Sequence, residues 1–364
     1  MCYHSEPVTT RHIMASELTA ELLSQPASHA ARVMAIHRLD ELSAAYDVFL
    51  GDEARGLHDV RVAVRRLRSW LRAYETEVGD TLRKKTKRRL RTLAHASNPA
   101  RDAEVAVEWI AAQTAAAPRE RPGLRFMTQR FEKERDDASA DARHVLERKM
   151  PRVMSALSKE LQTYWTKHDV TGTEPAATMA EATRGVLRDH GERLARAASK
   201  VESAGDARRA HRVRIAAKRL RYILETLTGN ATAATLVKRL TTLQDLLGAA
   251  HDAHVIANRI VREIGEYAAR DARHVAMRAM QLSDDDVVAT VPPFSRTRAG
   301  LTALAVRAHE DDQRGVTTFH DSWRGRQIQS IVAAVTLLAD GLGITDTPTS
   351  PALVESDRSD LASA

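Results

Sequence analysis

The segment HDVRVAVRRLRSWLRAYE, residues 58–75, carries two patterns that both have the spacing of an α-helix. Apolar residues recur every three or four positions and form one stripe: Val60, Val64, Leu67, Leu71 and Tyr74. A second stripe, about 110° round the helix, is basic and consists of His58, Arg61, Arg65, Arg68 and Arg72. The segment therefore predicts a helix that buries one edge and presents a row of cations beside it.

The same pattern occurs a second time, in HRVRIAAKRLR at residues 211–221. An offset of 153 residues aligns five basic positions: His58 with His211, Arg61 with Arg214, Arg65 with Lys218, Arg66 with Arg219 and Arg68 with Arg221. Farther along, an offset of 150 aligns RRLRTLAHASNPARDAEV (88–105) with KRLTTLQDLLGAAHDAHV (238–255). These matches predict a tandem duplication of a unit of roughly 150 residues.

We expect an all-α protein, because aromatic residues make up only 4% of the chain and β-branched residues rarely cluster. Turn and capping signals place the helices of the first unit at 28–49, at 52–79 with Asp52 as N-cap, from Thr81 with an interruption at Asn98-Pro99, and towards Trp165 with a kink or break at Pro151. The same signals place the helices of the second unit at 177–202, 207–228 and 231–265, with a last stretch to about residue 340.

Four helices in each unit predict two four-helix bundles that face each other across a pseudo-twofold axis. The expected division is an N-terminal tail at 1–14, a first repeat at 15–170, a second repeat at 171–344 and a disordered polar tail at 345–364.

A single cysteine, Cys2, allows no disulfide within the chain and fits a reducing compartment. The N-terminus lacks the pattern of a secretion signal, and the longest apolar stretch, 331–339, is too short to cross a bilayer. We therefore expect a cytoplasmic protein without a membrane partner.

Positive charge is concentrated in one window of the chain. Between Arg55 and Arg101 there are fourteen Lys or Arg residues and four acids, a local net charge of +10, whereas the whole chain carries +7. Like charges one helical turn apart cost about 0.2–0.5 kcal/mol each, so an ordinary solvated face would alternate its signs. The repetition of this unfavourable pattern in both halves indicates a binding site for an anion.

The spacing of the cations favours an extended polyanion over a single small phosphate, because successive positions of each row lie about 5 Å apart. The helix after the first row, with RKKTKRRLR at 83–91, adds Lys84, Arg88 and Arg91 on one face. The chain has no P-loop motif, and aromatic residues do not interleave the cations as base stacking would require. A polymer that is all phosphate is therefore favoured, with contacts to a nucleic-acid backbone as an alternative.

The paired HDVRVAVRRLR and HRVRIAAKRLRY segments, each followed by RDAEV or HDAHV, resemble the CHAD family (conserved histidine α-helical domain) over roughly residues 15–340. The resemblance implies two four-helix bundles with a basic central surface that binds inorganic polyphosphate, in some members at polyphosphate granules. The implied binding residues are His58, Arg61, Arg65, Arg66, Arg68, His211, Arg214, Lys218, Arg219 and Arg221, with support from Lys84, Arg88, Arg91 and Arg239. Glu225 opposite Arg72, and His251 in place of an arginine, depart from the pattern and weaken the second half. The E-x-E-x-K motif of an enzymatic domain often fused to this family is absent.

Histidines raise two further possibilities. His251 and His254 have a spacing that could hold a metal, although capping or hydrogen bonding between helices is the simpler expectation. His58 and His211 could accept a phosphoryl group, but no acidic cluster for Mg²⁺ lies near them in sequence. We therefore predict a binding protein without catalytic residues, cofactor or metal. The alternatives are an enzyme acting on polyphosphate or phosphate esters and a helical nucleic-acid-binding protein. Polyanion binding is expected to tighten as the pH falls, because a bound polyanion favours the charged form of a histidine among arginines.

Overall fold

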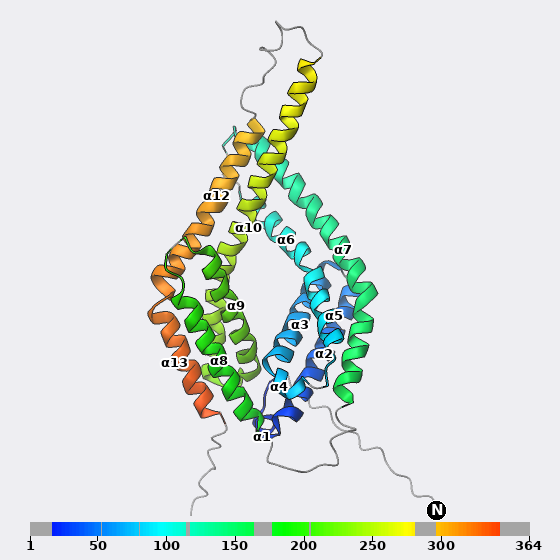
Figure 1. Ribbon diagram of the computed structural model, residues 1–364, viewed down its shortest axis with the longest axis vertical. Helices are drawn as coiled ribbons and strands as arrows, with labels where there is room; N and C mark the ends of the chain where they lie inside the picture. The colour runs from blue at the N-terminus through cyan, green and yellow to red at the C-terminus, as the bar shows by residue number, and fades with distance from the viewer. Residues whose placement is uncertain are drawn as a thin grey trace, which may run out of the picture.

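The computed structural model describes residues 17–51, 53–79, 81–113, 117–163, 177–203, 205–280 and 296–342. Regular secondary structure in these ranges is helical, and the β pairing found there is an isolated bridge between Pro26 and Thr178. The predicted all-α fold is confirmed (Figure 1). Asp52, the boundary between repeats at 170–171 and both predicted tails lie outside the described residues. No helix in the described ranges combines the length and the apolar character needed to cross a bilayer.

The helices of the first half follow the predicted order. They are α1 (Ala20–Ser24), α2 (Ala27–Gly51), α3 (Glu53–Ala73), α4 (Glu75–Val78), α5 (Lys84–Ala96), α6 (Asn98–Ala111) and α7 (Arg121–Gln162). The predicted interruption at Asn98-Pro99 is confirmed, since Ser97 separates α5 from α6. The expected break at Pro151 is wrong, because α7 continues through it. Pro151 is exposed while Met150 and Val153 beside it are buried, so packing on both sides of the proline holds the helix together.

The second half repeats this order with its breaks at other places. It contains α8 (Met179–Ser199), α9 (Ala207–Leu224), a 3₁₀ turn η1 (Glu225–Leu227), α10 (Ala231–Ala279), α12 (Arg296–Thr318), a π-helical turn η3 (Phe319–Trp323) and α13 (Arg326–Gly341). The counterpart of α5 and α6 is thus one helix, α10, whereas the counterpart of α7 is divided by η3. Helix α10 is also longer than the predicted 231–265, because Tyr267 and Arg270, which lie beyond the predicted end, contact the ring of Phe126 on α7.

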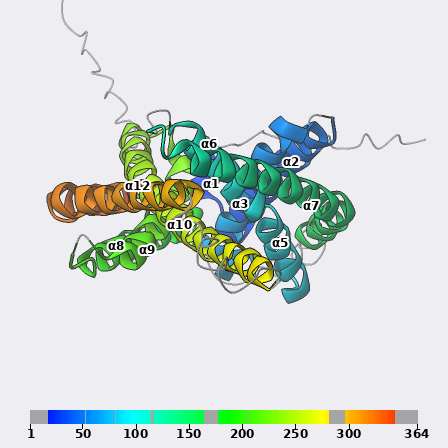
Figure 2. The same ribbon diagram turned by 90° about the horizontal axis from the view of Figure 1, so that it is seen from above.

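The two halves lie side by side and meet at both ends of the molecule (Figures 1 and 2). Helix α2 packs on α3 and α8 packs on α9, while α3 contacts α9, α2 contacts α8 and α7 contacts α12. Each of these contacts between the halves joins helices at the same place in the repeat order. This arrangement agrees with the predicted pseudo-twofold relation, which itself stays a prediction.

The hydrophobic core runs through both halves instead of dividing at the repeat boundary. Trp70 of α3 and Tyr74, which directly follows α3, lie in the larger cluster. The Trp70 indole N–H donates to the carbonyl oxygen of Ala31 (2.8 Å), and the Tyr74 hydroxyl lies 3.0 Å from that of Thr183 on α8. A smaller cluster combines apolar side chains of α6 and α7 with those of α10 and α12. The two bundles are therefore held in a fixed relation by shared core, which positions α3 beside α9.

The crossing of α7 and α12 is closed by two glycines, Gly123 and Gly300. A Cβ atom added to Gly123 would lie 2.5 Å from the backbone carbon of Gly300, and one added to Gly300 would lie 2.4 Å from the carbonyl oxygen of Glu120. Both distances are shorter than the closest approach of two non-bonded atoms. The two backbones can touch here only because neither residue has a side chain.

Gly123→Ala should therefore force these backbones apart and lower the free energy of unfolding by about 1–3 kcal/mol. Gly185→Ala is the matched control, because Gly185 lies inside α8 with nothing within 4 Å of the added Cβ. That change should instead stabilise the protein by about 0.4–1 kcal/mol. Urea denaturation of both variants measures the difference, and equal effects of the two changes would show that the glycine contact does not constrain the crossing.

Candidate functional site

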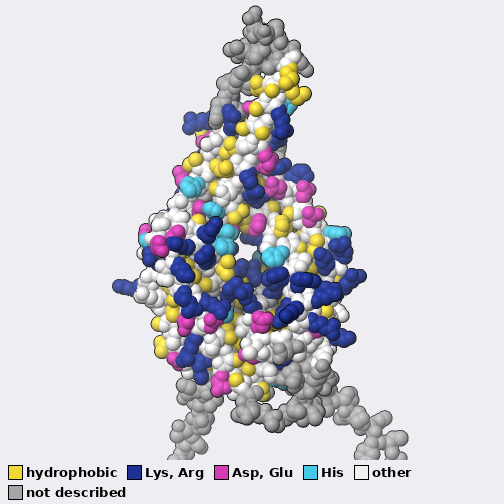
Figure 3. All heavy atoms as spheres, viewed as in Figure 1, with side chains coloured by type: hydrophobic (Ala, Val, Ile, Leu, Met, Phe, Trp, Pro, Cys, Tyr) yellow, Lys and Arg dark blue, Asp and Glu magenta, His cyan; other side chains and the backbone are white. Residues whose placement is uncertain are grey.

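Helices α3 and α9 place their apolar and basic stripes as the sequence predicts. The apolar residues are at most 7% exposed: Val60, Val64, Leu67 and Leu71 on α3 with Tyr74 directly after it, and Val213, Ala217, Leu220, Leu224 and Leu227 along α9 and η1. The neighbouring cations are half-buried, except His58 and Arg72, which are exposed. Since α3 contacts α9, the two basic rows border the same interface between the halves. Lys, Arg and His side chains gather round a hollow in the middle of the face shown in Figure 3.

Five of the predicted residues form what we call the central cluster, which consists of Arg61 and Arg65 from α3 and of Arg214, Lys218 and Arg221 from α9. Burial lowers the pKa of Lys218 to about 7, and the positive charges of Arg65, Arg214, Arg221 and Arg61 lower it further. Burial likewise lowers the pKa of Arg61 to about 10, with Arg65 among the repelling neighbours. Cations from the two halves thus repel one another across the interface. The two rows are therefore close enough to form one site.

Arg61 and Arg214, which the repeat makes equivalent, are seated against the next helix in different ways. The Arg61 guanidinium donates to the carbonyl oxygen of Ser97, at the break between α5 and α6. The guanidinium of Arg214 lies over Gly248 of the unbroken helix α10, with Nε 3.6 Å from where a Cβ would be. Arg61 is therefore held by a backbone acceptor, whereas Arg214 lies against the helix surface at a glycine.

Tyr222 lies between the guanidinium groups of Arg65 and Arg221, whose central carbons are 5.6 and 5.1 Å from the ring centroid. The ring face attracts both cations and reduces their mutual repulsion. The Nε atom of Arg65 is buried without a hydrogen-bond partner in the described residues, whereas that of Arg221 donates to Gln244 (3.1 Å). Tyr222 therefore contacts two cations of opposite halves, of which Arg65 retains a buried donor without a partner in the described residues.

Glu225, which the sequence analysis treated as a weakness of the second row, connects the two halves. Its carboxylate accepts from Arg221 of its own half at 2.8 Å and lies 3.4 Å from Nε of Arg66 on α3. Arg66 is thus engaged in an ion pair across the interface, whereas the ion pair of Arg221 lies within its own half.

Four more predicted residues form a second cluster, which consists of Arg68, Arg72, Arg91 and Arg219. Burial lowers the pKa of Arg68, and so do the charges of Arg91 and Arg72. Burial and the charge of Arg72 also lower the pKa of Arg219, with Arg193 of α8 contributing. Arg72 therefore lies close to Arg219, and the second cluster continues the basic surface along the same pair of helices.

The remaining predicted residues lie differently. His58, Lys84 and Arg88 are exposed. Arg239 does not join the clusters, because its guanidinium donates to Ser330 and to the backbone and side chain of Gln327 on α13. The inclusion of Arg239 is therefore not supported: its place on α10 directs it towards the outer helix of its own half.

The histidines of α10 point to two different helices. The ring of His251 lies 4.1 Å from that of His211 on α9, centroid to centroid, and burial together with the charge of His211 lowers the pKa of His251 to about 4. Burial, Arg214 and Lys218 lower the pKa of His211. His254 instead donates from Nδ1 to the buried Asp312 of α12 (2.9 Å), which confirms the expected hydrogen bond between helices. The described residues contain no group of three or more His, Cys, Asp or Glu side chains arranged for a metal ion.

Two acids that the sequence analysis used only to align the repeats lie beside the central cluster. Burial raises the pKa of both Asp102 and Asp252, although Arg61 acts against this at Asp102 and Arg214 acts against it at Asp252. The charge of Asp102 raises the pKa of Asp252 further, so the two equivalent carboxyls lie near each other. Their pairing at an offset of 150 was the signal that could have identified them.

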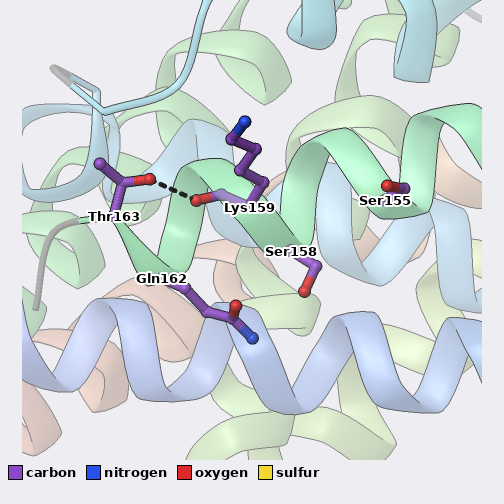
Figure 4. Close-up of a pocket in the computed structure, with 5 residues that line it drawn as sticks. All are labelled: Ser155, Ser158, Lys159, Gln162 and Thr163. Atoms are coloured by element: carbon purple, nitrogen blue, oxygen red, sulfur yellow. Dashed lines mark hydrogen bonds between the residues drawn. The ribbon is translucent and has the colours of Figure 1, made fainter.

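A separate surface depression lies at the C-terminal end of α7 (Figure 4). It is lined by Ser155, Ser158, Lys159, Gln162 and Thr163, and the Thr163 hydroxyl donates to the carbonyl oxygen of Lys159 at 2.6 Å. One helix supplies all these residues, with a single cation among them, so the depression does not match the anion chemistry of the basic surface.

Lys218→Met tests the electrostatics of the central cluster. Because burial and the arginines lower the pKa of Lys218 from 10.5 to about 7, the unfolded chain holds one more proton than the folded protein between these values, and stability rises with pH in that window. The variant loses this contribution. The free energy of unfolding of the variant relative to the original protein should therefore be higher at about pH 6 than at about pH 9, as measured by urea denaturation. The same difference at both pH values would mean that Lys218 titrates normally.

Comparison with known proteins places this fold and these motifs in one family. The CHAD domain model matches residues 33–261. Among solved structures, the CHAD domain from the plant Ricinus communis is similar with a TM-score of 0.56 and 24% identity, over 79% of this chain and 96% of that chain. PptA from Streptomyces chartreusis is similar with a TM-score of 0.56 and 12% identity, over 82% of this chain and 100% of that chain. The search of curated proteins found no match. Because the family model covers more than half of the sequence, the chain belongs to the CHAD domain family.

Proposed function

We propose that this protein binds inorganic polyphosphate on the surface formed by the central and second clusters. The observation that carries the proposal is the meeting of half-buried cations from α3 and α9 at Lys218, whose pKa falls to about 7 among four arginines. Such crowding is unfavourable in the free protein and becomes favourable when an anion lies between the charges. A role at polyphosphate granules would follow from this affinity.

The extent of the surface supports a polymer over a small anion. The two clusters follow α3 from Arg61 to Arg72, which is about 16 Å at the rise of an α-helix. Arginine groups along that length match successive phosphates, each with two parallel N–H donors. One phosphate ion would leave most of the repulsion uncompensated.

The surroundings of Tyr222 favour polyphosphate over nucleic acid. Tyr222 is only 6% exposed, and Arg65 and Arg221 occupy its neighbourhood, so its ring is not free to stack on a base. Trp70 and Tyr74, the aromatic residues of segment 58–75, are also buried in the core. The site thus offers charge without a means of base recognition, and we propose binding without turnover.

Arg65→Ala/Arg214→Ala should weaken the binding of long-chain polyphosphate by about a hundredfold, since each hydrogen bond to a charged group contributes about 1.5–3 kcal/mol. The ligand-free variant should melt no lower than the original protein, because the change removes like-charge repulsion. The control is Arg273→Ala/Arg278→Ala, which removes the same charge from the exposed end of α10. Binding is measured by titration calorimetry, and unchanged affinity of the first variant would refute the proposed site.

Two further readouts of that experiment separate the alternatives. Duplex DNA should not displace polyphosphate at physiological salt, whereas equal competition would favour a nucleic-acid-binding protein. Release of phosphate from polyphosphate in the presence of divalent cations would identify an enzyme.

The affinity for long-chain polyphosphate should rise as the pH falls from about 9 to about 7. Lys218 is largely neutral at the upper end, and a bound polyanion raises its pKa, so binding takes up a proton in this window. Lys218→Arg keeps the charge at every pH and should bind nearly equally at both values. Lys84→Arg, at an exposed position of α5, should retain the pH dependence. Titration of each variant with long-chain polyphosphate at both pH values measures this dependence. An unaltered pH dependence in Lys218→Arg would contradict the assignment of the proton uptake to Lys218.

A further inference from the structure

We propose a second anion-binding subsite on the outer side of α5, where α5 packs on α7, which the distal part of a long polyphosphate chain occupies. The inference rests on the proposed function and concerns the length of polymer that the protein prefers. The subsite is a cavity of about 420 Å³ lined by Arg89 and Thr92 of α5 and by Arg148, Lys149, Arg152 and Val153 of α7. We call its four cations the outer patch.

The core beneath the outer patch fixes its shape. Leu90 and Leu93 of α5 and Val153 of α7 are at most 2% exposed, and they pack between the two helices. Arg89, Arg148 and Arg152 are exposed above this floor, and Lys149 is half-buried. The cations therefore project from two rigid helices towards one concave place, and the hydroxyl of Thr92 lies at its edge.

The charge of the outer patch is not compensated by the protein. No ion pair joins any of its four cations to a carboxylate of the described residues, and no acid lines the cavity. Elsewhere on α7 the cations are paired one turn apart, as in Lys133–Asp137 (2.8 Å) and Arg143–Glu147 (2.7 Å). The residue one turn after Arg148 is instead Arg152, and such like-charge neighbours cost about 0.2–0.5 kcal/mol. The alternation of positive and negative side chains that is typical of a solvated helix face is thus interrupted at the cavity.

Helix α5 connects the outer patch with the basic surface. Arg91 belongs to the second cluster through its proximity to Arg68, while Arg89, two residues earlier, lines the outer cavity. Dark blue side chains accordingly extend from the centre of the molecule to the edge formed by α5 and α7 (Figure 3). A helix with its side chains is about 10–12 Å wide, so a flexible polyanion can pass over α5 and contact both places.

The subsite makes chain length a determinant of affinity. A chain of three phosphates that fills the central cluster cannot also reach across α5. A long chain can, and its second contact is intramolecular, with a correspondingly high effective concentration. Long polyphosphate should therefore bind more tightly than its number of contacts on the central surface alone would give.

Arg148→Ala/Arg152→Ala tests the subsite with two exposed positions whose replacement leaves the core untouched. Its affinity for long-chain polyphosphate should fall about tenfold, and its affinity for tripolyphosphate should not change. The slope of log affinity against log salt concentration should decrease by about two for the long chain only. Arg273→Ala/Arg278→Ala again serves as the charge-matched control and should change neither value.

The outcomes separate this inference from the proposed function. If Arg148→Ala/Arg152→Ala binds the long chain as the control does, or loses tripolyphosphate to the same extent, the subsite is refuted while the central site stands. If Arg65→Ala/Arg214→Ala keeps its affinity for tripolyphosphate, the proposed function fails at the central cluster, whatever the outer patch does.

Discussion

The structure depends on the contact of α3 with α9, which buries apolar residues of both helices. The same contact brings together cations that repel one another. Burial of the apolar stripes on both helices stabilises the contact, at about 25 cal/mol for each Å² of apolar surface removed from water, and the basic rows are carried along with it. Three local interactions reduce the resulting strain: Tyr222 attracts Arg65 and Arg221, Glu225 pairs with Arg221 and Arg66, and the carbonyl of Ser97 accepts from Arg61. None of them neutralises Lys218 or Arg214. The fold therefore keeps a region in which the repulsion between cations is only partly relieved, and the proposed function rests on this departure from a local rule of stability.

Sequence periodicity was sufficient for the parts of the molecule that local rules govern. The stripes of α3 and α9, the interruption before Asn98 and the matching order of helices all follow from spacing and turn residues. The end of α10 and the continuity of α7 through Pro151 did not, because contacts with other helices, such as that of Tyr267 with Phe126 and the burial of Met150, override the local signal. Packing decides these cases, and packing partners distant in the sequence leave no periodic trace.

The candidate site shows the same limit. Membership of the central cluster could be predicted from the two rows, since residues at equivalent positions of a repeat tend to face the same axis. Arg239 shares the character of its neighbours in sequence, yet it lies against α13, and Glu225 proved to connect the halves that it seemed to weaken. Both differences depend on which helix packs beside the residue. The charge of a side chain can be read from the sequence, whereas the oppositely charged residue that lies beside it depends on the fold.

The repeat also shows how one requirement can be met by two local structures. Arg61 and Arg214 both reach the interface from the same face of equivalent helices, and each guanidinium lies close to the next helix of its own half. In the first half the chain breaks between α5 and α6, which frees the carbonyl of Ser97 as an acceptor. In the second half α10 continues, and Gly248, which aligns with Asn98, leaves room for Arg214 to lie on the helix surface. Arg61 is thereby tied to a specific atom and Arg214 is not. Arg214 therefore retains more unused hydrogen-bonding capacity than Arg61, so the less constrained of the two arginines belongs to the second half.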